Sequence, residues 1–447
     1  MDSDLEIISC YDSHVHWLMT GEKKSFLDLE KFPSFELSSL ESLNFAEIEK
    51  KAFKGSWLMG FGWREDQFLT PPHFSVLDKL SLKVPICFIK KDAHSCLLNS
   101  VGIEIFKEKF KEDKDLGKFL ERDEANQPTG ILKESGFYAL LRSLPALTSI
   151  EIKNYLLEGQ NYFLKNGYTH IRDMTCSLEQ WKVLVELENT KQLKIQAEIN
   201  FHFESLQELE NVILPLINKE KETKLSHLQI QGVKLFYDGS LSSETALLSE
   251  PYLGTSGSVA GAYGLRLWRS EEVKAAMRLA WGSGLQISVH TLGDQAVSEV
   301  VQCAKELQKE KITGILNLEH VELVSSKTVS EMKSLHVKCH MQPSHWLSDK
   351  KWIKAKINST LMKNLFQWEL LRKAKVPLFF GSDSPIEEAN VTLLLEALRD
   401  SEQNGILKLN DEPERFLSHP TLKNGLSKFK NKVLQEVYLN NERVFKK

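Results

Sequence analysis

The sequence predicts an α/β protein built on an eight-stranded (β/α)8 barrel, a TIM barrel. Short apolar or β-branched runs recur along the 447 residues, and segments with helical periodicity lie between them. This alternation of strand and helix is typical of parallel β/α units, and eight units close naturally into a barrel. The eight predicted strands are Leu5–Tyr11, Thr169–Met174, Lys194–Phe203, Leu228–Tyr237, Gln286–Val289, Ile315–Leu318, Val337–Met341 and Val376–Gly381. Predicted helices are Ser149–Asn166, Leu178–Glu188, Glu271–Gly282, Ala296–Gln308 and Ser326–Ser334.

The first connection of the barrel is too long for an ordinary loop, because about 150 residues separate His16 from Thr169 whereas β/α connections usually span a few residues. We therefore predict a large insertion after strand one, placed over the active-site mouth. It holds the turn-rich segment Gly60–Trp63 and a predicted strand, Val84–Lys90. The predicted division is barrel strand one at 1–17, the inserted subdomain at 18–148, the remaining barrel at 149–400 and a C-terminal tail at 401–447.

Composition limits the partners of this chain. The formal net charge is -4, and no basic block of the kind that binds nucleic acid or an anionic membrane is present. The six cysteines are scattered without a Cys-x-x-Cys pair, so we expect free thiols in a reducing compartment. No apolar run reaches the roughly 20 residues that span a bilayer, and the acidic start lacks signal-peptide features. We expect a cytoplasmic protein with a small-molecule substrate.

Strand one ends in a pair of histidines, His14 and His16. Side chains two residues apart on a strand point to the same face, so both rings can reach one metal ion. A single His-x-His pair is weak evidence, because two surface histidines often occur at this spacing. Other donors must support the interpretation.

Further donors fall where other predicted strands end: Lys234, His290, His320 and Asp383. Taken singly, each histidine is more often a hydrogen-bonded core residue, and Asp383 could equally cap the following helix. Lys234 is harder to dismiss, since burying an ammonium inside an apolar strand is costly unless it is paired or chemically altered. Strand ends converge on one mouth of a barrel, so these nitrogen and oxygen donors predict a site for zinc or a similar divalent ion.

The chain resembles the amidohydrolase superfamily, and within it amidohydrolase family 3, the YtcJ-like branch that includes N-substituted formamide deformylases. The resemblance covers roughly residues 10 to 395. It is carried by the segments Asp12–His16, Gly60–Trp63, Asp92–Ser95 with Asn99-Ser100, Pro128–Glu134, Gly167–Thr169 with Arg172-Asp173, Lys234–Ser240, His290–Ala296, Leu318–His320, Gln342-Pro343 and Gly381–Pro385.

The resemblance implies a barrel hydrolase with one or two divalent ions, zinc being the expected metal. It implies that His14 and His16 bind one ion, that a carboxylated Lys234 bridges two ions, and that His290 and His320 bind the second. Asp383 would be both a metal ligand and the catalytic residue. It would take a proton from the metal-bound water, which becomes hydroxide, and would later give that proton to the departing amine. The expected reaction is hydrolysis of an amide-type C–N bond in an N-acyl or N-formyl amine.

Several residues outside the metal set are candidates for supporting roles. Substrate contacts are expected from Trp63, His94 and His345, and carboxylates that orient metal-bound imidazoles are expected from Asp173, Asp294 and Glu319. Glu134 is a candidate for either role. The alternatives are that Trp63 is a packing aromatic, Asp294 a helix cap and His345 a surface loop residue.

The chain departs from the resembled family at its ends and in one loop. The usual flanking β-sandwich is predicted to be absent or vestigial, with Val437–Phe445 as the remnant of its last strand, in a hairpin around Asn440-Asn441. We expect the uncovered barrel surface to be packed by a helical tail near Lys423–Leu434 or buried in a homodimer. In the loop Ser240–Thr245, a serine and Glu244 replace the glycine and arginine of relatives. If that loop contacts the substrate, we expect a preference away from anionic groups.

Two other functions stay open. A mononuclear deaminase on the same fold shares the His-x-His pair and the final aspartate but lacks the strand-four lysine, so Lys234 argues against it. A metal-binding scaffold without catalytic activity is supported only by the missing sandwich.

Overall fold

The computed structural model describes residues 4–32, 53–80, 83–113, 115–220, 223–253, 262–410 and 413–447. Its centre is an eight-stranded parallel sheet in the order β16-β15-β14-β13-β12-β11-β10-β2. A bridge between Val15 and Ser384 brings the first and last strands together, so the sheet curls into a barrel, as predicted. The strands are β2 (Tyr11–Val15), β10 (His170–Cys176), β11 (Gln196–His202), β12 (Leu228–Phe236), β13 (Gln286–Thr291), β14 (Leu316–His320), β15 (Val337–Met341) and β16 (Leu378–Phe380).

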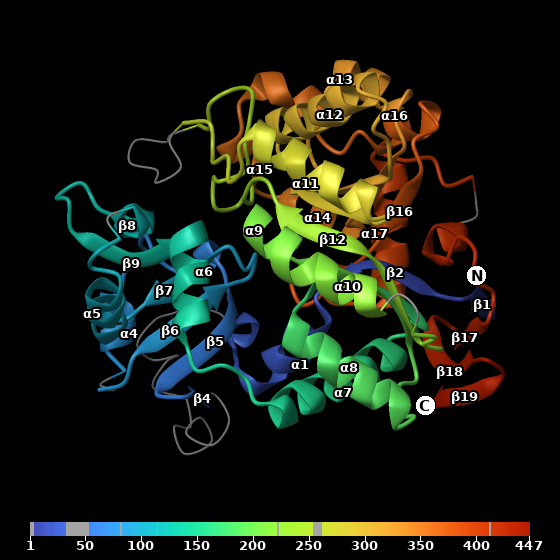
Figure 1. Ribbon diagram of the computed structural model, residues 1–447. Coiled ribbons are helices and arrows are strands. Elements are labelled where there is room, and N and C mark those ends of the chain that lie inside the picture. The colour runs from blue at the N-terminus through green and yellow to red at the C-terminus, as the bar shows by residue number, and fades with distance from the viewer. Residues whose placement is uncertain are drawn as a thin grey trace.

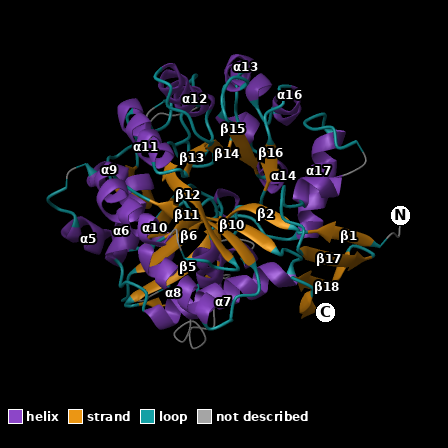
Figure 2. Ribbon diagram, turned by 45° about the vertical axis from the view of Figure 1, so that its right-hand side comes forward, coloured by secondary structure: helices purple, strands orange, loops and turns teal. Residues whose placement is uncertain are grey.

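Helices surround the barrel, as Figure 2 shows. The helices pack on the barrel because each has an apolar face. In α12, for example, Val297, Val300, Val301 and Ala304 are buried at helical spacing against the strands. No helix in the described ranges combines the length and apolar character needed to cross a membrane. The main outer helices are α7 (Ser149–Lys165), α8 (Leu178–Asn189), α10 (Leu214–Glu220), α11 (Ser270–Gly282), α12 (Asp294–Lys309), α13 (Ser326–Met332), α16 (Trp368–Lys373) and α17 (Val391–Gln403).

The first predicted strand, Leu5–Tyr11, is wrong as a single barrel strand. The chain bends at Ser9, whose φ is 48°, and only the part from Tyr11 onward enters the barrel. The part before the bend is β1 (Leu5–Ile8), which pairs antiparallel with a strand near the C-terminus. Ile7 is 1% exposed and Ile8 is 50% exposed, which is the alternation of a sheet with one wet face rather than of a buried parallel strand.

Both chain ends meet in one antiparallel sheet, β1-β17-β18-β19, at the side of the barrel (Figure 1). Its other strands are β17 (Gly425–Lys430), β18 (Val433–Leu439) and β19 (Glu442–Lys446). The hairpin around Asn440-Asn441 is confirmed, since both residues have positive φ and join β18 to β19. The predicted helix near Lys423–Leu434 is wrong, because a tight turn at Asn431-Lys432, also with positive φ, splits this segment into two strands.

The C-terminal sheet packs on the barrel itself. Phe429, Leu434 and Val437 join the same core cluster as the barrel strands. Gly167 permits this contact: its φ is +96°, and a Cβ there would lie 2.7 Å from the Phe429 ring. The described sheet is therefore larger than the single remnant strand expected from sequence, and it covers barrel surface without a helical tail.

The long first connection forms a sheet of its own, drawn beside the barrel in blue and teal in Figure 1. The segment Gly60–Trp63, predicted as turn-rich, lies inside strand β5. Both of its aromatic side chains are buried. The boundaries at 18 and 148 stay a prediction. The strands are β3 (Leu27–Asp28), β4 (Phe53–Lys54), β5 (Trp57–Trp63), β6 (Ile86–Lys90), β7 (Ser95–Leu98), β8 (Leu120–Arg122) and β9 (Pro128–Lys133), covered by α5 (Ser100–Lys109) and α6 (Glu134–Ser143).

Candidate metal centre

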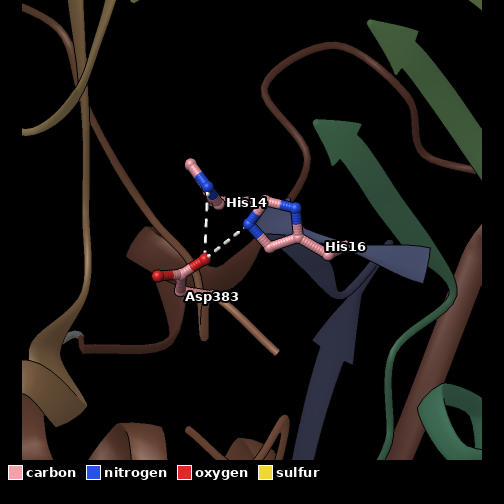
Figure 3. Close-up of side chains that lie close together, drawn as sticks. All are labelled: His14, His16 and Asp383. Atoms are coloured by element: carbon pink, nitrogen blue, oxygen red, sulfur yellow. Dashed lines mark ion pairs between the residues drawn. The ribbon is translucent and has the colours of Figure 1, made fainter. Parts of the chain in front are cut away.

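The histidines and the aspartate of the predicted metal set meet at the carboxyl ends of the barrel strands. Asp383 Oδ1 lies 3.0 Å from His16 Nε2 and 3.3 Å from His14 Nε2, and Figure 3 shows both rings facing that oxygen. The His320 ring centre is 4.7 Å from that of His14 and 4.5 Å from that of His290. Side chains more than 300 residues apart in the chain thus form one compact cluster.

Each imidazole of the cluster has one nitrogen held by a neighbouring side chain or carbonyl. This arrangement fixes the ring orientation and leaves the other nitrogen available as a metal ligand. His14, His16 and His320 are held at Nδ1, which leaves Nε2, whereas His290 is held at Nε2, which leaves Nδ1. The contacts are His14 to Glu319 Oε2 at 2.7 Å, His16 to Thr175 Oγ1 at 2.9 Å, His320 to Gln342 Oε1 at 2.8 Å and His290 to the Gly239 carbonyl at 3.3 Å.

The backbone at two ligand positions is in the left-handed region that non-glycine residues rarely adopt. His320 has φ 74° and Asp383 has φ 60°. Such conformations cost free energy and persist where the surroundings impose them, which is common at functional sites. Asp12 supplies part of that constraint, since its carboxylate accepts hydrogen bonds from the Ser382 amide at 2.9 Å and the Ser382 hydroxyl at 2.6 Å.

Burial and charge set the protonation of the cluster. Burial lowers the pKa of His290 and of His320 well below the usual value, which favours the neutral rings that bind metals. Burial opposes ionisation of Asp383, but the charge of His14 and the close contacts with the His14 and His16 rings prevail and hold its pKa well below the ordinary range. Burial also lowers the pKa of Lys234 to about 8, so its amine loses its proton more readily than that of a surface lysine.

Unpartnered buried atoms show that a divalent cation fits this cluster. Within the described part of the chain, His14 Nε2, His290 Nδ1, Lys234 Nζ and Asp383 Oδ1 are buried without a hydrogen-bond partner. Buried polar atoms are rarely left unpaired, and several around one point call for a shared partner. Nitrogen and oxygen donors of this kind suit zinc and related ions. The ligand atoms of His14, His16 and Asp383 all lie within 4.8 Å of one another.

His345 joins the cluster from α14 (Pro343–Asp349), so the surface-loop alternative is wrong. Its Nδ1 lies 3.0 Å from Glu322 Oε1, and its Nε2 lies 3.6 Å from Asp383 Oδ2. Its ring stacks parallel to that of His320 at 5.9 Å between centres. His345 is therefore placed to contact a molecule bound at the Oδ2 side of Asp383.

The three candidate supporting carboxylates have different positions. Glu319 contacts a cluster imidazole, that of His14. Asp173 and Asp294 instead accept hydrogen bonds from backbone, side-chain amide or hydroxyl groups. In the described structure, neither accepts a hydrogen bond from a cluster histidine. Asp173 accepts from the Trp17 amide at 3.0 Å and Gln180 Nε2 at 2.6 Å, while Asp294, at the start of α12, accepts from the Ser249 amide at 3.0 Å and its hydroxyl at 2.5 Å.

The insertion brings His94 to the cluster. The ring centre of His94 lies 5.2 Å from that of His290, and its Nδ1 lies 3.1 Å from Glu134 Oε2.

Trp63 does not reach the cluster, which corrects its predicted substrate contact. Its indole is 1% exposed in the insertion core and donates to the Phe88 carbonyl at 2.7 Å, so it is the packing aromatic of the alternative interpretation.

The loop after β12 attaches the barrel to the insertion. The Asp92 carboxylate accepts hydrogen bonds from Ser240 at 3.0 Å, from Ser243 at 2.7 Å and from Ser242. Glu244 lies 3.7 Å from the Lys356 ammonium. These serines and this acid thus contact protein groups, and the expected preference against anionic substrates stays a prediction.

Four functional candidates have no role in the sequence analysis: Asp12, Arg172, Glu322 and Gln342. A sequence signal exists for Arg172, which lies inside a predicted buried barrel strand, and for Asp12, which lies two residues before His14 and accepts a hydrogen bond from its amide. Glu322 and Gln342 contact the cluster through tertiary proximity, so spacing along the chain does not reveal them.

A parallel barrel that gathers nitrogen and oxygen donors at the carboxyl ends of its strands has the architecture of a metal-dependent barrel enzyme. The profile of the amidohydrolase family matches residues 11–398. The chain belongs to the amidohydrolase family, and this membership implies a divalent metal ion.

Two curated relatives match most of the chain. The putative amidohydrolase YtcJ of Bacillus subtilis is 27% identical over 88% of this chain and 74% of its own length. The protein LONG AFTER FAR-RED 3 of Arabidopsis thaliana is 25% identical over 87% of this chain and 67% of its own length. The resemblance to the YtcJ-like branch is thereby confirmed.

Solved structures agree in fold. An uncharacterized metal-dependent hydrolase from Pyrococcus furiosus is 27% identical, covers 88% of this chain and 77% of its own, and superposes with a TM-score of 0.64. A second such hydrolase, from Pyrococcus horikoshii, is 24% identical, covers 93% of this chain and 78% of its own, with a TM-score of 0.67. The barrel fold therefore has experimental counterparts.

Proposed function

We propose that this protein is a metal-dependent hydrolase that cleaves an amide-type C–N bond of a small molecule, such as an N-acyl or N-formyl amine. The observation that carries the proposal is the convergence of His14, His16, His320 and Asp383 on one point, with buried donor atoms left unpartnered. A barrel needs neither this convergence nor these unpaired atoms for its stability.

In this proposal His14, His16 and Asp383 hold one divalent ion, with zinc the first candidate. Lys234, His290 and His320 hold a second ion where the protein binds two. A divalent ion bound here supplies a water of lowered pKa and a Lewis acid for the substrate carbonyl. The protein's part is to exclude bulk water, and it does so: His14 is 0%, His290 3% and Asp383 5% exposed.

We also propose that Lys234 is carboxylated on Nζ. Its ammonium is buried against the Phe236 ring, 4.0 Å from the ring centre, and no described group accepts a hydrogen bond from it. Carbon dioxide adds to the neutral amine with release of one proton, and the lowered pKa of Lys234 makes the neutral form accessible. The resulting carbamate is an anion, which suits a position between cations.

Asp383 is the proton carrier of the proposed reaction. Its carboxylate accepts a proton at the centre of the cluster and later donates it to the leaving amine. His345 and His94 flank the cluster from the barrel and from the insertion and are the proposed substrate contacts.

The test is amine release from a panel of N-formyl and N-acetyl amines by protein loaded with zinc, compared with the same protein after chelation. We expect release with the loaded protein, its loss on chelation and its return when zinc is restored. If the loaded protein releases no amine from any member of a broad panel, amide cleavage is contradicted. Ammonia release from amino-substituted heterocycles would then identify the deaminase alternative.

A further inference from the structure

Arg172 is a fully buried guanidinium in the middle of β10, next to the candidate metal centre. Its relative exposure is 0%, as is that of Glu319, which it contacts through Nη1 and Oε1 at 2.9 Å. Burying two charges in a barrel interior is costly and is recovered only when geometry and further hydrogen bonds are good. The function proposed so far does not use this pair.

Glu319 connects Arg172 to the cluster. One carboxylate oxygen, Oε1, accepts from Arg172, and the other, Oε2, lies 2.7 Å from His14 Nδ1. A guanidinium has only donors, so the carboxylate between the two groups must act as the acceptor for both. His14 therefore donates from Nδ1, and its Nε2 is the ring nitrogen that faces Asp383, 3.3 Å from Oδ1.

The remaining donors of Arg172 reach other strands of the barrel. They contact the Ser13 carbonyl on β2 at 3.2 Å, Gln231 Oε1 on β12 at 2.5 Å and Ser288 Oγ on β13 at 2.5 Å. With Glu319 on β14, one side chain bonds to four strands other than its own. Three of these strands, β2, β13 and β14, carry candidate ligand histidines.

A guanidinium can make these hydrogen bonds to several strands at once because its donors form a planar fork. A lysine would offer one nitrogen where Arg172 offers three, so it could not bond to Gln231, Ser288 and Glu319 together.

We propose that Arg172 is a positioning residue for the metal centre: it fixes Glu319 as the hydrogen-bond acceptor for His14 and holds the ligand-bearing strands in register, and so sets the affinity for the metal. This inference rests on the metal binding proposed above. It assigns to Arg172 no contact with substrate or metal.

The test is the zinc dissociation constant of the apoprotein, measured by competition with a chromophoric chelator. Arg172→Met alone would leave the buried Glu319 carboxylate without its cationic partner, so we choose the double variant Arg172→Met/Glu319→Gln, which removes both charges together. Groups that support metal ligands typically change metal affinity 10–100-fold when mutated. We expect the double variant to fold and its zinc dissociation constant to rise at least about tenfold.

Tyr11→Phe is the matched control. It removes another buried side-chain hydrogen bond from β2, the one of 2.6 Å to Glu198, but touches no ligand histidine. Glu319→Gln alone is measured beside them, because Glu319 contacts His14 directly. A merely structural role for Arg172 would leave the zinc affinity of the double variant equal to that of Glu319→Gln. A zinc affinity of the double variant within twofold of that of Glu319→Gln or of the wild type therefore overturns the proposal.

Two further outcomes are decided in advance. If the double variant does not fold, Ser288→Ala is measured instead, because it removes one acceptor of Arg172 with little change in volume. A weakened zinc affinity in Ser288→Ala supports the proposal, and an unchanged zinc affinity overturns it. If the wild type binds no zinc, the proposed function fails and this inference fails with it. Equal affinities of wild type and variant overturn this inference alone.

Discussion

Asp383 lies between two pairs of imidazoles. Its Oδ1 faces His14 and His16, and its Oδ2 lies 3.6 Å from His345 and 4.0 Å from His320. The surrounding rings keep its pKa low, so the carboxylate is ionised at neutral pH and ready to accept a proton. The amide of an asparagine keeps the size of this group but cannot carry that proton.

Asp383→Asn should therefore lower kcat by about 10²-fold or more, because general acid–base catalysis usually contributes about 10²–10⁴-fold. The fold should persist, since the Asp383 amide hydrogen bond to the His14 carbonyl, at 2.8 Å, belongs to the backbone. The measurements are amine release, thermal melting and metal content. Turnover at the wild-type rate with retained metal would remove Asp383 from the proton-transfer role.

The sequence reveals a site residue when burying its side chain would be costly without a functional partner. It does not reveal residues that also have a common structural use. Lys234 could be recognised because an ammonium does not belong in an apolar strand. Asp294 and Trp63 could not be resolved, because an acid after glycine and an aromatic in a strand each have a common structural use. Their tertiary partners, Ser249 and Phe88, decide the matter and lie 45 and 25 residues away.

The turn between β6 and β7 is the element that joins the insertion to the barrel. Asp92 in this turn accepts three serine hydroxyl hydrogen bonds from the loop after β12, and Lys90 donates to Glu65 at 2.9 Å and to the Ser242 carbonyl at 3.2 Å. The same turn carries His94 to the cluster. Loosening this contact should move His94 without disturbing the barrel.

Asp92→Asn should loosen the insertion, because the buried ion pair with Lys90 and the charge-assisted hydrogen bonds would be lost. The expected cost is about 1–3 kcal/mol in the free energy of local opening. Hydrogen exchange of the backbone amides of β6 and β7 measures it directly. Asp66→Asn is the control, since its pair with Arg64 is exposed, and equal exchange rates in both variants would contradict the role of Asp92.

The same contact predicts a pH dependence. The pKa of Asp92 is lowered well below its ordinary 3.8 although burial opposes this, mainly by the charge of Lys90. The folded state thus binds fewer protons than the unfolded state, so the stabilisation is present above about pH 4 and is lost as the pH falls further. The difference in urea midpoint between wild type and Asp92→Asn should shrink from pH 6 to pH 3, and a constant difference would contradict this assignment.

Elements with a simple pattern were predictable, and elements with a hidden change of direction were not. In the barrel strand Val337–Met341, apolar residues alternate with polar ones, which is a strand pattern, and the structure has that strand with the same ends. The split of Leu5–Tyr11 was hidden because both of its parts are apolar. The turn at Asn431-Lys432 was missed because positive φ at an asparagine and a lysine has no fixed sequence signature.

At the scale of the whole molecule, the two chain ends stabilise the barrel from outside. Phe429→Ala should lower the free energy of unfolding by about 3–5 kcal/mol, because it opens a cavity where the ring packs on Gly167 in the barrel core. Urea denaturation measures this. Val433→Ala is the control in the same sheet, since Val433 is 40% exposed, and an equal effect of the two substitutions would show that the sheet is not part of the core.

The barrel carries the candidate metal ligands at the ends of five of its strands, and the proposed function requires that they bind a metal ion. The most direct test is metal content per chain, by elemental analysis of protein purified without added metal, for the wild type, Lys234→Ala and Lys338→Ala. Lys338 is a half-buried lysine on β15 that lies 6.0 Å from the Phe379 ring and serves as the control. We predict one or two equivalents of zinc or a similar ion in the wild type and Lys338→Ala, and fewer in Lys234→Ala. No metal in any of the three, even after reconstitution, would contradict the account.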